Sequence, residues 1–170
     1  MSAQRQGSRL NAWLLGACVL ALSGLAPAAG PGARADEPAV ETDVFTIARG
    51  GQIYDNWYAV LEHDAPAATH PAYPAEGKQK GAATWRCKEC HGWDYRGAEG
   101  AYGKGSHFTG IKGLRAMAGQ PPAQIAAAVR DAKHGYTAEL IPDSALNKLA
   151  TFVSAGQVDM DRYIERGTKK

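Results

Sequence analysis

The 170-residue sequence predicts an all-α fold of three to five helices. Two observations lead to this prediction. Apolar residues recur at steps of three and four in several segments, which is the period of an amphipathic helix. The segments between them lack the alternation of apolar and polar residues that marks a half-buried strand, and they are rich in glycine and proline, as loops are.

The N-terminal 35 residues have the pattern of an export signal. Two arginines precede an apolar run at residues 12–26, and Ala-Arg-Ala at 33–35 is the small-x-small pattern at which such signals are cleaved. We therefore expect a cleaved secretory signal peptide at 1–35 and a single domain at 36–170, with no integral membrane span in the mature chain. Retention of the leader would instead anchor the domain to a membrane.

Removal of this leader changes the charge balance. The full chain has 19 basic and 17 acidic side chains, and three of the basic ones, Arg5, Arg9 and Arg34, lie in the leader. The mature chain is therefore close to neutral, and bulk charge gives no reason to expect nucleic-acid binding.

The first helix is expected at residues 42–63, with Thr42 or Asp43 as its N-cap. Gly50 and Gly51 each cost such a helix about 1 kcal/mol relative to alanine. Two glycines are useful there only if another helix crosses closely.

A long loop is expected at residues 64–84, where three prolines and two glycines accompany few apolar residues. His63 and His70 flank it or lie within it, and we interpret both as polar surface residues. The alternative is that the loop folds back toward a functional site.

Residues 87–91 read Cys-Lys-Glu-Cys-His, which is the CxxCH attachment signature of c-type haem. Each thiol adds to one haem vinyl group, and His91 offers an imidazole nitrogen to the iron. A redox-active dithiol would be expected after a strand, and a zinc site would need two further ligands at close spacing. Neither is apparent, so we expect one covalent haem, bound through Cys87, Cys90 and His91.

After the motif, the sequence predicts a glycine-rich and aromatic loop at 92–114, two helices and a C-terminal extension. The glycines would let the backbone approach a flat ligand, and the aromatic side chains would cover it. One helix should start at the Pro121-Pro122 pair and end near Lys133, and the other should run from residue 143 or 144 to Gly156. The extension at 157–170 has a weaker helical pattern.

This order of elements around CxxCH resembles the class I cytochromes c. In that family the first and last helices cross, and a glycine and an aromatic residue of the first meet an aromatic residue of the last. Gly51, Tyr54 and Phe152 hold the matching positions here. The resemblance implies a cytochrome c-like fold, with the helices wrapped around one covalently bound haem. Two departures are the long loop before the motif and the sequence Glu-Leu-Ile-Pro at 139–142, where the family usually has its methionine ligand.

The second axial ligand therefore has to be sought elsewhere. We favour His134, which is expected at the end of the third helix, and Met117 is the alternative. Met160, His107 and an open coordination position are further possibilities. His107 lies where the family brings a backbone carbonyl to the proximal imidazole.

The expected function is one-electron transfer in the periplasm, where c-type haem is attached. The expected partners are other redox proteins, such as a membrane-bound or periplasmic oxidoreductase. Ligation by two histidines would give a lower reduction potential than a methionine and a histidine. The chain is thus expected to be an electron carrier and not itself an enzyme. The alternative is a haem subunit of a periplasmic oxidoreductase that acts on a small inorganic compound, such as a sulfur species. A gas sensor would need an output domain that the chain is too short to hold.

Overall fold

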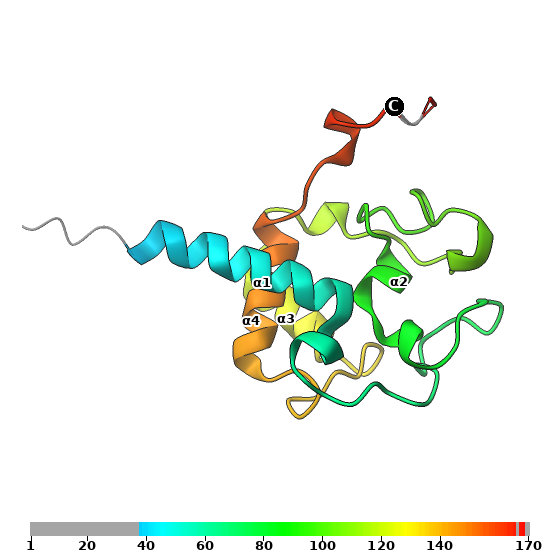
Figure 1. The fold of residues 1–170 in the computed structure, drawn as a ribbon, viewed down its shortest axis with the longest axis horizontal. Coiled ribbons are helices and arrows are strands. Elements are labelled where there is room, and N and C mark those ends of the chain that lie inside the picture. Colours follow the sequence, from blue (N-terminus) through cyan, green and yellow to red (C-terminus); the bar gives the residue numbers. More distant parts are fainter. Residues whose placement is uncertain (1–37, 166, 169–170) are drawn as a thin grey trace, which may run out of the picture. The chain divides into compact units, whose positions relative to one another are not determined.

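The structure is a computed structural model that describes residues 38–165 and 167–168. This part of the chain contains four α-helices, four short 3-10 helices and no strand, which confirms the all-α prediction (Figure 1). None of the helices described is long and apolar enough to cross a membrane. The predicted signal peptide at 1–35 lies outside the described residues.

Helix α1, Pro38–Val60, begins before the predicted cap residues and contains a kink. The kink lies at Asn56, whose backbone angles of φ −157° and ψ 80° are not helical. The Arg49 guanidinium donates a hydrogen bond to the carbonyl of Val60, at 2.7 Å, and so satisfies an orphan acceptor at the helix end. The last turn of α1 is therefore held to the turns before it.

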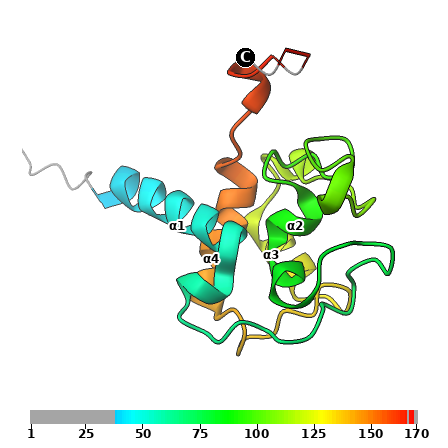
Figure 2. The same cartoon turned by 45° about the vertical axis from the view of Figure 1, so that its right-hand side comes forward.

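Helix α4, Asp143–Ala155, starts at a predicted position and ends before Gly156. Figures 1 and 2 both show it crossing α1. At the crossing, a Cβ atom on Gly50 would overlap the carbonyl of Lys148 and would lie 2.6 Å from Cβ of Phe152. The helices thus approach as closely as the paired glycines predict.

The core lies between α1, α4 and helix α3, Pro122–Val129. Its fully buried side chains include Ile53 and Trp57 of α1 and Leu149 of α4. Helix α3 ends four residues before the predicted Lys133. Asp131 explains the early end, since its carboxylate accepts hydrogen bonds from the backbone N–H groups of Lys133, at 2.9 Å, and His134, at 2.8 Å. Such a local turn competes with further helix.

The 64–84 loop leads into a 3-10 helix, Gly81–Trp85, which is anchored to the core. The carbonyl of Trp85 accepts hydrogen bonds from Nε1 of Trp57, at 2.9 Å, and from the hydroxyl of Tyr136, at 2.6 Å. Nε1 of Trp85 donates to the carbonyl of Ala68, at 2.8 Å. The end of the loop is therefore fixed immediately before the CxxCH motif.

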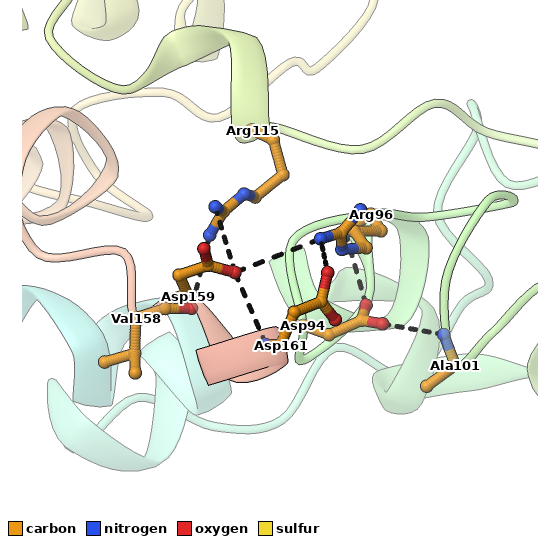
Figure 3. A network of polar contacts seen from close by, with 7 residues as sticks. All are labelled: Asp94, Arg96, Ala101, Arg115, Val158, Asp159 and Asp161. Carbon is orange, nitrogen blue, oxygen red and sulfur yellow. Dashed lines mark hydrogen bonds and ion pairs between the residues drawn. The ribbon is translucent and has the colours of Figure 1, made fainter. Parts of the chain in front are cut away.

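The C-terminal extension has one short 3-10 turn, Met160–Arg162, in place of the longer helical pattern. Figure 3 shows how two arginines tie it to the loop after CxxCH. Arg96 forms ion pairs with Asp159 and Asp161, and Arg115 forms one with Asp159 at 3.3 Å. Ion pairs therefore hold the C-terminal extension against Arg96 and Arg115.

Candidate functional site

A cavity of about 670 Å³ lies beside the CxxCH motif. Its lining is mostly apolar, and the charged side chains along it, Arg86, Lys112 and Lys133, are all basic. Both motif cysteines, His91 and His134 line the same cavity. The apolar part of the lining includes Ile111, Leu114, Met117, Ile125, Val129, Leu149 and Val153.

Helix α2, Cys87–His91, is a single turn that carries the motif. Asp55 of α1 holds it through ion pairs with Arg86, at 2.9 Å, and with Lys88. The hydroxyl of Tyr54 also donates to the carbonyl of Gly92 at the end of α2, at 2.6 Å. Helix α1 therefore positions both ends of the motif.

The two motif cysteines are free thiols that do not form a disulfide. Burial raises the pKa of Cys87 to about 12 and that of Cys90 to about 11. A redox-active dithiol needs a lowered thiol pKa, because the thiolate is the nucleophile. The surroundings of these cysteines therefore do not favour thioredoxin-like chemistry.

The imidazole of His91 is oriented by a backbone carbonyl. Its Nδ1 lies 2.9 Å from the carbonyl oxygen of Lys112, which fixes Nδ1 as the protonated nitrogen and leaves Nε2 available to a metal. Burial lowers the pKa of His91 and so favours the neutral imidazole that binds metals.

An isolated antiparallel β-bridge to Gly97 places the Lys112 carbonyl beside the His91 ring. Gly97 has a φ of +54°, and a Cβ at this position would overlap the carbonyl of Ile111 and lie 2.7 Å from the backbone nitrogen of Gly113. Only glycine combines this conformation with so close an approach. The N–H of Gly97 also donates to the carbonyl of His91, at 2.8 Å, so the loop holds the helix end as well as the ring.

The glycine-rich loop agrees with its prediction only in part. Gly110 and Gly113 lie along the cavity, but none of the loop's four aromatic side chains does. Trp93 and Phe108 are partly exposed, at 42% and 46%. Tyr95 packs on Tyr54 and Phe152, and Tyr102 stacks on His107. These four side chains therefore do not form the walls of this cavity, and the prediction that they cover a flat ligand does not hold for it.

His134 lies in the turn after α3 and not on the helix itself. Its Nδ1 is 3.0 Å from a carboxylate oxygen of Asp131, so its Nε2 is the nitrogen left for a metal. A metal-binding histidine often donates a hydrogen bond to a carboxylate from the ring nitrogen that does not bind the metal.

The rings of His91 and His134 lie close to each other, with centroids 6.2 Å apart and planes 28° from parallel. Metal–imidazole bonds of about 2 Å on each side, with about 1 Å from nitrogen to ring centre, would separate two such centroids by about 6 Å. The observed separation of the centroids thus agrees with the one that two imidazoles on opposite sides of one metal ion would have.

The described residues contain no group of three or more histidine, cysteine or acidic side chains that could hold a metal ion alone. A metal held by these two imidazoles would need its remaining ligands from elsewhere. A planar macrocycle that carries its own metal meets this need, and the apolar cavity walls suit its faces.

The other candidate ligands lie in different places. Met117 lines the cavity, but Met160 lies at a separate hollow beside the C-terminal segment. His107 bonds to the buried carboxylate of Glu89, at 2.8 Å, and does not line the cavity. The carbonyl expected near His107 is supplied by Lys112 instead.

The interpretation of His70 as a polar surface residue is wrong. Its side chain lies along the cavity, and the residue is 8% exposed. The alternative, in which the long loop folds back, describes its position correctly. No pattern around His70 distinguishes it from His63, which is exposed.

Comparison with protein-family models, with curated proteins and with solved structures finds no match for this chain.

Proposed function

We propose that this protein is a monohaem c-type cytochrome that transfers single electrons in the periplasm. The observation that carries the proposal is the pair His91 and His134. Their ring centroids lie 6.2 Å apart, and both residues line a mostly apolar cavity that both CxxCH cysteines also line. When bound, haem supplies reversible one-electron chemistry at its iron. The proposed attachment is through Cys87 and Cys90.

The residues around the cavity fit such a group. A volume of about 670 Å³ is within the range of about 300–1,000 Å³ that is usual for cofactor sites. The basic residues Lys112 and Lys133 suit the carboxylates that haem carries, whereas Arg86 is already paired with Asp55. The resemblance to class I cytochromes c is supported by Gly51, whose Cβ would lie 3.0 Å from the Phe152 ring.

The chain's own contribution would be to hold both imidazoles in place. Lys112 and Asp131 each bind the Nδ1 nitrogen of one of them, so neither ring needs to turn when the oxidation state changes. Fast electron transfer requires that the iron ligands move little between the two oxidation states. Two fixed imidazoles therefore favour an electron carrier over an enzyme with an open coordination position.

The test is expression with export and the c-type haem attachment machinery, followed by denaturation. We expect the haem absorbance to stay with the wild-type chain and to be lost from a Cys87→Ala, Cys90→Ala double variant. A potentiometric titration should give one reversible one-electron step. Haem that separates from the denatured wild type would contradict covalent attachment, and fast binding of carbon monoxide would favour the enzyme-subunit alternative.

A further inference from the structure

The loop at 64–84 reaches the candidate site through one buried side chain, His70. The backbone N–H of His70 donates to Oγ1 of Thr84, at 2.9 Å, and Thr84 is itself 1% exposed. The hydroxyl of Thr84 donates in turn to the carbonyl of Gly81, at 2.6 Å. The backbone of His70 is thus tied to the last residue of the loop.

The protonation of the His70 ring follows from its neighbours. The backbone N–H of Ala72 donates to Nδ1, at 3.1 Å, so Nδ1 must be an acceptor. The hydrogen of the neutral ring is therefore on Nε2, which lies 2.9 Å from the carbonyl oxygen of His134 and donates to it. Burial lowers the pKa of His70 and so favours this neutral form.

Two aromatic rings fix the plane of this imidazole. The centroid of Trp85 is 4.4 Å away and that of Tyr136 is 5.6 Å away. Since Trp85 and Tyr136 are themselves joined by a hydrogen bond, the donor on His70 has little freedom to move.

His134 has few other ties to the rest of the fold. Within the described chain, its remaining hydrogen bonds are to Asp131, which belongs to the same turn. The bond from His70 is the one that joins His134 to a different segment. The bond from His70 holds the backbone carbonyl of His134, whereas Asp131 bonds to its ring and to its backbone N–H.

Building on the proposed function, we propose that His70 is a positioning residue for the distal ligand, with the 64–84 loop acting as a clamp on the backbone of His134. The clamp holds His134 opposite His91 and slows its replacement by another ligand. The loop, whose length departs from the class I pattern, would thus make the sixth coordination position resistant to external ligands.

The test measures the rate at which cyanide binds to the oxidised holoprotein, followed by absorbance. In His70→Phe a ring remains but the donor is lost, and we expect cyanide to bind about fivefold faster, the factor for one net hydrogen bond. In His70→Gln an amide can still donate to the His134 carbonyl, and the rate should return to within about twofold of wild type. His63→Phe, at an exposed histidine, is the matched control and should leave the rate unchanged.

Thermal unfolding of every variant separates positioning from general stability. If His70→Phe does not take up haem, the shorter His70→Asn, which cannot reach the carbonyl, replaces it. Wild-type rates in the variants without a donor would overturn the proposal. So would equal acceleration in His70→Gln and the variants without a donor, because the donor would then be irrelevant. A wild-type haem that is not ligated by His134 would also overturn this positioning role, but it would leave the electron-carrier proposal standing. Haem that separates from the denatured wild type would overturn the proposed function itself, which distinguishes the two failures.

Discussion

Gly50 of α1 lies directly against the carbonyl group of Lys148 in α4, so closely that a Cβ atom would overlap the carbonyl oxygen. A helix backbone cannot move aside without separating the two helices. This contact sets how closely α1 approaches α4, and α1 in turn positions the motif through Tyr54 and Asp55.

Gly50→Ala should therefore destabilise the protein by about 3 kcal/mol, at the upper end of the usual cost of overpacking. Gly51→Ala is the matched control, since its Cβ would meet the Phe152 ring at 3.0 Å, and a ring can shift. Denaturant unfolding of both holoproteins measures the difference. Equal losses of stability would show that the Gly50 contact does not determine the crossing.

Tyr136→Phe should cost about 1 kcal/mol in unfolding free energy. The lost hydroxyl donates to the Trp85 carbonyl, but that carbonyl keeps its second donor, Nε1 of Trp57. It is thus not left unsatisfied. Tyr163→Phe, at a side chain that is 70% exposed, is the control and should be close to neutral. A loss of 3 kcal/mol or more in Tyr136→Phe would mean that the ring itself has shifted.

Asp55 should make the stability depend on pH in the acid range. Burial acts to raise its pKa, but the hydrogen bond from Lys88 and the charge of Arg86 outweigh burial, and the pKa is lowered. The stabilisation is therefore complete above the unfolded pKa, about 4, and is lost as the pH falls through the lower folded-state pKa.

Asp55→Asn should flatten this acid limb in urea unfolding measured from neutral pH downward. Because the Asp55 side chain is 51% exposed, the cost at neutral pH should stay below about 1 kcal/mol. Asp64→Asn, at an exposed carboxyl in the 64–84 loop, is the control. An unchanged acid limb in Asp55→Asn would show that these ion pairs contribute nothing to stability.

His134→Met should raise the reduction potential, on the order of 100 mV within the span of about 0.8 V that axial ligands give haem. Met117→Leu, which changes the alternative ligand at the same cavity, should leave the potential close to that of the wild type, because no iron ligand is changed. Potentiometric titration of both variants makes the comparison. The opposite pattern, a shift in Met117→Leu alone, would identify Met117 as the ligand.

The sequence alone predicts the parts of this protein that local patterns determine. Pro122 and Gly156 mark helix ends correctly, and the glycine pair at 50 and 51 correctly predicts a close helix crossing. His134 is placed beside the cavity as expected, although the Asp131 turn, and not the helix, carries it there.

Contacts between distant segments could not be predicted in the same way. The carbonyl that orients His91 belongs to Lys112, because a backbone bridge to Gly97 sets the register of the loop. His70 reaches His134 across 64 residues of chain, and its identity as a donor depends on the backbone of Ala72. Backbone groups have no sequence signature, which is why these roles were missed.

The central claim, that His91 and His134 bind one haem iron between them, is tested most directly by low-temperature EPR of the oxidised wild-type protein. Because the two rings are 28° from parallel, the account predicts a low-spin rhombic spectrum with three resolved g values. The near-infrared band of an iron–methionine bond should be absent. A high-spin spectrum, or that band in the wild type, would contradict the claim.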